Sequence, residues 1–85
     1  MNVSEIIRSA REIVGELTGL KVENVTGFEK DGDGWTVTVE VLELQRVPST
    51  MDVMGSYELT LSDKGDVTSF QRRRRFPRAA SEGND

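Results

Sequence analysis

The chain has 85 residues, a formal net charge of −4, and neither cysteine nor histidine. Its length allows one small domain. The missing residue types exclude disulfides, thiolate metal sites and the commonest general base, so we expect no metal or cofactor. No apolar run approaches the roughly 20 residues that span a bilayer. The N-terminus does not read as a signal peptide. We therefore expect a soluble cytoplasmic protein.

The charge is unevenly distributed along the chain. Residues 1–71 contain 6 Lys/Arg and 13 Asp/Glu, which gives −7, whereas residues 72–78 contain five arginines and no acidic residue. The remaining residues, 79–85, add −2. The sequence thus predicts an acidic body with a basic segment near its C-terminal end.

An amphipathic helix is predicted over residues 5–18. Apolar residues recur there at the i, i+3, i+4 spacing of one helical face: Ile6, Ile7, Ala10, Ile13, Val14 and Leu17. Ser4 suits the N-cap, and Gly19 suits the left-handed position that ends a helix. A helix this short is marginal alone, so we expect it to lie on a sheet.

Four strands are predicted after the helix, at residues 21–30, 35–46, 51–61 and 67–76. The second is the clearest, because β-branched and aromatic residues alternate with polar ones. Its inward row is Trp35, Val37, Val39 and Val41. Val41 and Leu42 are adjacent and both apolar, which suggests either a bulge there or a strand end that is covered on both faces. Turn residues at 30–34 and 62–66 favour short hairpins.

Together these elements predict an α+β domain, with one N-terminal amphipathic helix packed on a four-stranded antiparallel meander sheet. We expect this single domain to span residues 1–76. Residues 77–85 are small, polar and charged, and they are expected to form a disordered tail.

The run of arginines in the last strand is the most distinctive functional feature. Strand alternation would place Arg72 and Arg74 on one face and Arg73 and Arg75 on the other. The run can be read as a charged sheet edge that prevents aggregation, as a site for an acidic protein surface, or as a phosphate-binding site. Its flanking aromatics do not interleave with the arginines, which disfavours nucleic acid.

The central strand supplies charged residues that could accompany this run. Glu40 and Glu43 have opposite strand parity, so they do not form a carboxylate pair for acid–base catalysis. With Arg46 they are more typical of ion-pair partners. We therefore expect a protein that is not an enzyme.

Several segments in order resemble the gas vesicle protein O (GvpO) family. The segments are AREIVGELTG at residues 10–19, GWTVTVEVLELQRVP at 34–48, Asp52-Val53, Tyr57-Glu58 and the arginine run ending in Phe76. The resemblance implies a non-enzymatic accessory protein for gas vesicle assembly. Its expected partners are other gas vesicle proteins, either shell or accessory. It also implies a cytoplasmic location, with association with the vesicles left open.

The residues expected to bind a protein partner lie on the central and last strands. They are Glu40, Glu43, Arg46, Arg72, Arg73, Arg74 and Arg75. Three alternatives stay open: a regulatory or nucleic-acid-binding module that uses the arginine strand, a small-ligand site between helix and sheet, and a homodimer through a sheet edge or the polar sheet face.

Overall fold

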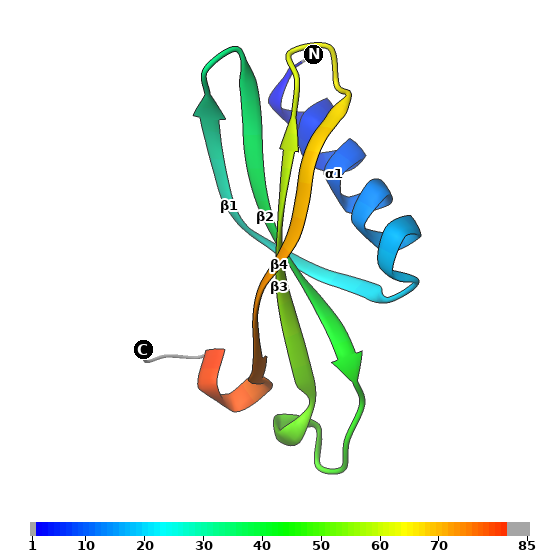
Figure 1. Ribbon diagram of the computed structural model, residues 1–85. Coiled ribbons are helices and arrows are strands. Elements are labelled where there is room, and N and C mark those ends of the chain that lie inside the picture. Colours follow the sequence, from blue (N-terminus) through cyan, green and yellow to red (C-terminus); the bar gives the residue numbers. More distant parts are fainter. Residues whose placement is uncertain (1, 82–85) are drawn as a thin grey trace.

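A computed structural model describes residues 2–81 as one helix followed by an antiparallel sheet (Figure 1). The helix is α1 (Val3–Thr18), and the strands are β1 (Lys21–Asp31), β2 (Gly34–Leu44), β3 (Val53–Leu61) and β4 (Val67–Pro77). Two short 3-10 segments complete it, η1 (Ser49–Met51) and η2 (Arg78–Ser81). The sheet order is β1-β2-β3-β4. The predicted α+β meander is therefore confirmed.

Helix α1 begins at Val3, two residues earlier than the sequence suggested. Its N-cap is Asn2 and not Ser4, because the Asn2 side chain accepts the Glu5 N–H at 2.9 Å. The Glu5 carboxylate in return accepts the Asn2 N–H at 3.0 Å, which completes a capping box. At the other end Gly19 adopts φ 69°, as predicted for the residue that ends the helix.

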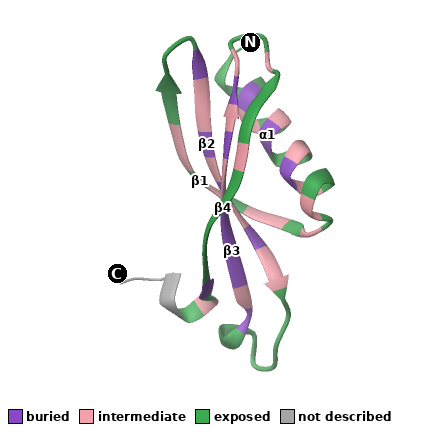
Figure 2. Cartoon of the chain, in the orientation of Figure 1, coloured by how far each residue is buried: buried purple, intermediate pink, exposed green. Residues whose placement is uncertain are grey.

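The core lies between α1 and the middle of the sheet. Its fully buried side chains come from the helix, β2 and β3: Ile6, Ala10, Val14, Val37, Val39, Val41, Leu59 and Leu61. Figure 2 shows these buried positions along the strands that α1 faces. The predicted inward valines are confirmed. Leu17, predicted on the helix face, is exposed in the last turn of α1.

Trp35 lies at the edge of the core instead of inside it. Its ring is partly buried and stacks on Phe28 with centroids 5.0 Å apart. The Lys30 ammonium lies 4.7 Å from the centroid of the Trp35 ring. The tryptophan thus closes the end of the hydrophobic core and pairs with a cation at the surface.

Five residues interrupt the pairing of the strands, since each lies in a gap of the register. They are Glu23 and Thr26 in β1, Glu43 in β2, and Thr68 and Arg73 in β4. The bulge expected near Val41 and Leu42 therefore occurs at Glu43. An unpaired residue shifts the alternation of the side chains that follow it, which can re-aim a charged group.

Strand β4 ends one residue later than the strand predicted over residues 67–76. Pro77 is the last residue of β4 and Arg78–Ser81 form η2, so regular structure extends beyond the expected end at residue 76. Phe76 is buried, and it lies opposite Met54 in the sheet. Of the expected tail, residues 82–85 lie outside the described residues.

Candidate protein-contact surface

The bulge at Arg73 decides which arginines share a face. Arg72 lies opposite Tyr57 and Arg75 lies opposite Gly55, with Arg73 left over between the paired residues. Tyr57 and Gly55 are two residues apart on a regular stretch of β3, so they share a face. The predicted grouping, which separated Arg72 from Arg75, is wrong because simple alternation ignores the extra residue.

Glu43 links these two arginines. Its carboxylate accepts hydrogen bonds from Arg72 Nη1 at 3.1 Å and from the Tyr57 hydroxyl at 3.2 Å. It also forms an ion pair with Arg75, whose Nε lies 3.2 Å from Glu43 Oε1. The Glu43 side chain is only 8% exposed, whereas those of Arg72 and Arg75 are 49% and 55% exposed. A nearly buried anion therefore holds two cations whose outer sides face solvent.

Gly55 provides the space in which the Glu43 carboxylate lies. A Cβ atom added at Gly55 would collide with Glu43 Oε2 and would lie 2.7 Å from its Cδ. The side chain that approaches this glycine is therefore that of Glu43. We call Glu43, Tyr57, Arg72 and Arg75 the Glu43 cluster.

Helix α1 leaves this part of the sheet uncovered. With 16 residues it is roughly 24 Å long, whereas the 11 residues of β2 extend about 36 Å. Figure 1 shows α1 beside the half of the sheet that holds the β1–β2 and β3–β4 turns. Glu43 is near the opposite end of β2. The Glu43 cluster thus lies on the helix side of the sheet, beyond the helix.

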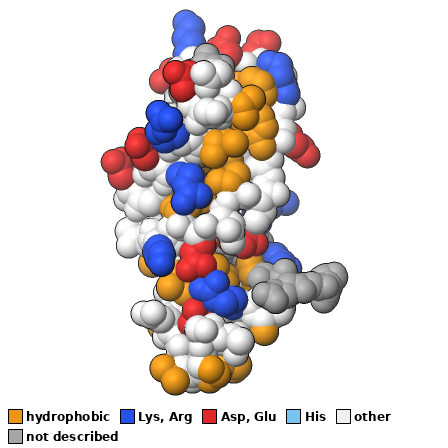
Figure 3. All heavy atoms as spheres, turned by 180° about the vertical axis from the view of Figure 1, so that it is seen from behind, with side chains coloured by type: hydrophobic (Ala, Val, Ile, Leu, Met, Phe, Trp, Pro, Cys, Tyr) orange, Lys and Arg blue, Asp and Glu red, His pale blue; other side chains and the backbone are white. Residues whose placement is uncertain are grey.

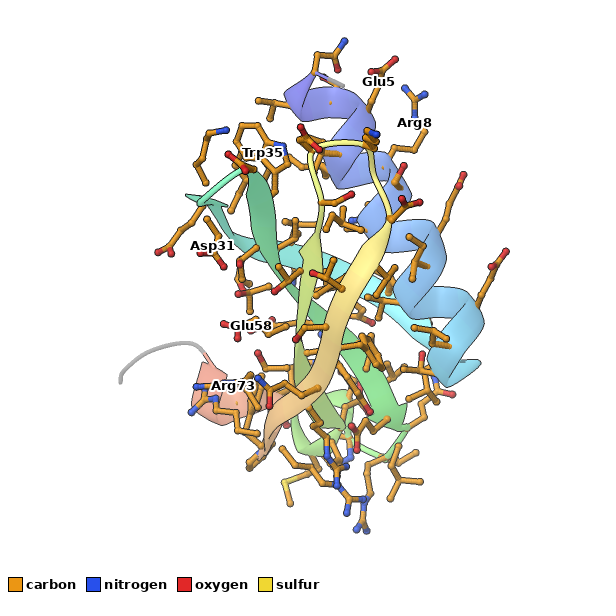
Figure 4. The ribbon with its side chains drawn as sticks, turned by 45° about the horizontal axis from the view of Figure 1, so that its top comes forward. Glu5, Arg8, Asp31, Trp35, Glu58 and Arg73 are labelled. Atoms are coloured by element: carbon orange, nitrogen blue, oxygen red, sulfur yellow. The ribbon has the colours of Figure 1, made fainter. Side chains whose placement is uncertain are left out.

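Two other arginines of the run serve different contacts. Arg73 pairs with Glu58 at 3.7 Å, and Figure 4 shows these two side chains beside each other. The Arg74 guanidinium lies 4.4 Å from the centroid of the Phe76 ring. Arg74 and Phe76 lie opposite Ser56 and Met54, on the sheet face away from α1.

The remaining predicted residues are not brought together with the Glu43 cluster. Glu40 lies opposite Ser56, on the sheet face away from Gly55 and Glu43. Arg46 is exposed in the connection after β2. The seven predicted residues therefore divide into a Glu43 cluster, an opposite face and a connection.

A second ionic cluster was missed by sequence reasoning. Arg78 binds Glu23 through Nη1 at 2.8 Å and Nη2 at 3.1 Å, and it binds Asp52 Oδ2 through Nη2 at 3.0 Å and Nε at 3.1 Å. We call these three residues the Arg78 clamp. Asp52 belongs to the segments that carry the family resemblance. No local pattern, however, connects Glu23 with an arginine 55 residues away.

The clamp shifts the titration of its members. The hydrogen bond from Arg78 lowers the pKa of the Glu23 carboxyl. The Arg46 backbone N–H, 2.8 Å from Asp52 Oδ1, lowers the pKa of Asp52, and Arg78 adds to this effect. Both carboxylates raise the pKa of Arg78. In the Glu43 cluster, burial raises the pKa of Tyr57, and the Glu43 charge contributes to the rise.

Other kinds of site were sought within residues 2–81. That part of the chain contains no group of three potential metal ligands and no pocket. Among the same residues, no helix is both long enough and apolar enough to cross a membrane. The fold and the Glu43 cluster define a small α+β domain whose distinctive surface feature is a charged cluster.

The chain belongs to the gas vesicle synthesis protein GvpO family, whose family model matches residues 1–82. Gas vesicle protein O of Streptomyces sp. (strain CB03234) is 46% identical over 77 residues, covering 91% of this chain and 60% of the relative. Gas vesicle protein O1 of Halobacterium salinarum is 39% identical over 69 residues, covering 81% of this chain and 58% of the relative.

A third relative has a similar level of identity. Gas vesicle protein O of Haloferax mediterranei is 40% identical over 70 residues, covering 81% of this chain and 50% of the relative. The chain thus spans 50–60% of the length of these relatives. No solved structure matches the chain. The family resemblance seen in the sequence is confirmed, and it supports a role in gas vesicle formation.

Proposed function

We propose that this chain is a non-enzymatic accessory protein of gas vesicle assembly that acts in the cytoplasm through contacts with other gas vesicle proteins. The contact surface we propose is the Glu43 cluster. The other residues predicted from the sequence, Glu40, Arg46, Arg73 and Arg74, belong to neighbouring surfaces and make a smaller contribution. Family membership supports the role in gas vesicle assembly, and the geometry of the Glu43 cluster supports its use as the contact surface.

The observation that carries this proposal is the contrast in exposure between the carboxylate and its arginines. The Glu43 side chain is nearly buried, while the side chains of the two arginines that it binds are about half exposed. An arginine fixed in one orientation loses less side-chain entropy when it binds a carboxylate on a partner. The cluster therefore suits recognition of an acidic protein surface.

The same pairing favours a protein partner over nucleic acid. Arg72 and Arg75 share Glu43, and Arg73 pairs with Glu58, so carboxylates offset much of the positive charge of the strand. Affinity for a phosphate backbone depends on uncompensated cations that release counterions. A partner that places one or two carboxylates beside the outer sides of Arg72 and Arg75 needs no such excess.

The test compares two double variants in a cell that expresses the gas vesicle proteins of the same organism. Arg72→Lys with Arg75→Lys keeps the charge but removes the planar guanidinium groups that bind two oxygens at once. We expect it to reduce co-purification of gas vesicle proteins and the yield of vesicles measured by light scattering. The matched control is Arg73→Lys with Arg74→Lys on the opposite face, which should leave both readouts close to wild type.

The outcomes distinguish the proposed contact surface from the proposed role in gas vesicle assembly. If the Arg73→Lys, Arg74→Lys control lowers co-purification and vesicle yield as much as the Arg72→Lys, Arg75→Lys variant does, the proposed contact surface is wrong. If deletion of the gene leaves vesicle yield unchanged, the proposed function itself is wrong. Thermal unfolding of each purified variant shows whether a loss of binding follows from a loss of fold.

A further inference from the structure

The connection between β2 and β3 exposes apolar side chains at one end of the molecule. Val47 is 98% exposed, Met51 is 55% exposed and Leu44 is 44% exposed. With Pro48, which is also exposed, we call these residues the hairpin tip. Figure 3 shows apolar side chains gathered at this end of the molecule. Scattered apolar residues are ordinary on a surface, but a contiguous group of them is typical of a contact site.

The hairpin tip is held in place by several hydrogen bonds. The Met51 N–H donates to the Pro48 carbonyl at 2.9 Å, and the Asp52 N–H donates to the Ser49 carbonyl at 3.0 Å. The Arg46 N–H donates to Asp52 Oδ1 at 2.8 Å. The two ends of the connection are thus joined through one carboxylate.

The Arg78 clamp fixes that carboxylate to the rest of the domain. Asp52 is only 3% exposed, and its second oxygen accepts from Arg78, which also binds Glu23 on β1. The Arg78 N–H donates to the Asp52 carbonyl at 2.7 Å. The fold thus uses a nearly buried ionic group to hold an apolar loop in solvent. A preformed loop of this kind binds a partner at a lower entropic cost than a mobile one.

Cations lie beside the hairpin tip. Arg46 is exposed in the same connection, and Arg75 lies opposite Gly55, two residues after the start of β3. An apolar centre with a charged rim is the usual anatomy of a protein interface. Here the rim is positive, so the complementary surface is an apolar groove edged by carboxylates. Two copies of this chain meeting tip to tip would instead bring their arginines together.

We propose that the hairpin tip is a docking site for another gas vesicle protein, which receives Val47 and Met51 in an apolar groove edged by acidic side chains. This inference rests on the proposed function and identifies a second contact besides the Glu43 cluster. The partner is therefore an acidic protein with an apolar groove and not a second copy of this chain.

The experiment expresses the tagged chain with each other gas vesicle protein of the same organism, one at a time, and measures affinity for those that co-purify. The variant is Val47→Asp with Met51→Asp. Because it places two charges in an apolar groove, we expect the affinity of at least one partner to fall at least about tenfold. Val47→Ile, which keeps the apolar surface, should bind like wild type.

The matched control is Val3→Asp. Val3 is about half exposed at the start of α1, where an acidic residue is favourable beside the helix N-terminus. It makes the same chemical change far from the hairpin tip and should leave affinity unchanged. Thermal unfolding and size-exclusion chromatography confirm that each variant is folded and report any change in oligomeric state.

Each outcome decides between the two proposals. Loss of affinity in the tip variant alone supports the docking site, even if the arginine variants of the Glu43 cluster bind normally. Undiminished affinity in a folded tip variant overturns the docking site and leaves the proposed function intact. Wild-type chain that binds none of the gas vesicle proteins overturns both. A tip variant that only changes from dimer to monomer assigns the surface to self-association and also overturns the inference.

Discussion

Replacing Gly55 by alanine should break the Glu43 cluster without touching any of its charged residues. Gly55 is outside the positive-φ region, so alanine can adopt its backbone conformation. The new Cβ, however, would occupy the space of the Glu43 carboxylate. The carboxylate must then leave the Tyr57 hydroxyl and the Arg72 and Arg75 guanidiniums.

The magnitude follows from the exposure of these groups. The hydrogen bond from a partly buried tyrosine to a carboxylate contributes about 1.5 kcal/mol, while each half-exposed arginine contributes about 0.5 kcal/mol. In the opposite direction, replacing a glycine by alanine reduces the conformational entropy of the unfolded chain, which stabilises the protein by about 0.4–1 kcal/mol. We expect a net loss of about 1.5–2 kcal/mol in the free energy of unfolding, or roughly 6–16 °C in the melting temperature.

A double-mutant cycle isolates the mechanism. Denaturant and thermal unfolding would be measured for wild type, Gly55→Ala, Glu43→Ala and the double variant. When Glu43 is already alanine, the Cβ at position 55 meets no carboxylate, so the same substitution should stabilise by about 0.4–1 kcal/mol. The effect of Gly55→Ala thus changes sign with the background. If Gly55→Ala lowers the free energy of unfolding equally in wild type and in Glu43→Ala, the conclusion that Gly55 provides the space for the Glu43 carboxylate is refuted.

Three further predictions concern the helix, the clamp and the arginine strand. Gly15→Ala should stabilise the protein by about 0.5–1 kcal/mol in thermal unfolding, because its Cβ would lie 3.8 Å from Val22 Cγ2, an ordinary contact; destabilisation would show that the helix needs glycine there. The pKa values of Glu23 and Asp52 are lowered in the folded state, so their stabilisation is complete above the ordinary values of 4.5 and 3.8 and is lost as the pH falls through the lower folded values. The melting temperature should therefore drop below about pH 4.5, and less so in Arg78→Gln; parallel pH profiles would contradict the clamp. In a gel-shift assay at low salt we expect no complex with duplex DNA, whereas a complex that weakens steeply with salt would favour the nucleic-acid alternative.

The hydrophobic pattern was sufficient to predict the arrangement of helix and sheet. Val37, Val39 and Val41 alternate without interruption, and all three are fully buried. The helical stripe likewise placed Ile6 and Val14 in the core. The ends of elements were less accurate, since capping depends on individual hydrogen bonds. Asn2, which precedes the apolar stripe, caps α1 in place of the equally suitable Ser4.

The candidate site was harder to predict because it depends on unpaired residues. Arg72 and Arg75 have opposite parity in the sequence, and only the extra Arg73 places them on one face. Glu43 is itself a bulge residue, so its carboxylate is directed over Gly55. A single added residue reverses every later position of a strand. Composition and alternation therefore identified the charged residues but not their partners.

The bulges on the two outer strands have a consequence for how this protein meets others. Both strands with a free side, β1 and β4, have two interruptions each, and the clamp residue Glu23 and the ion-paired Arg73 are among them. A neighbouring chain cannot continue a hydrogen-bond ladder along such an irregular border. Contacts between these strands and another protein would then be made by side chains and not by backbone pairing. A partner bound in this way can dissociate without separating strands of a shared sheet.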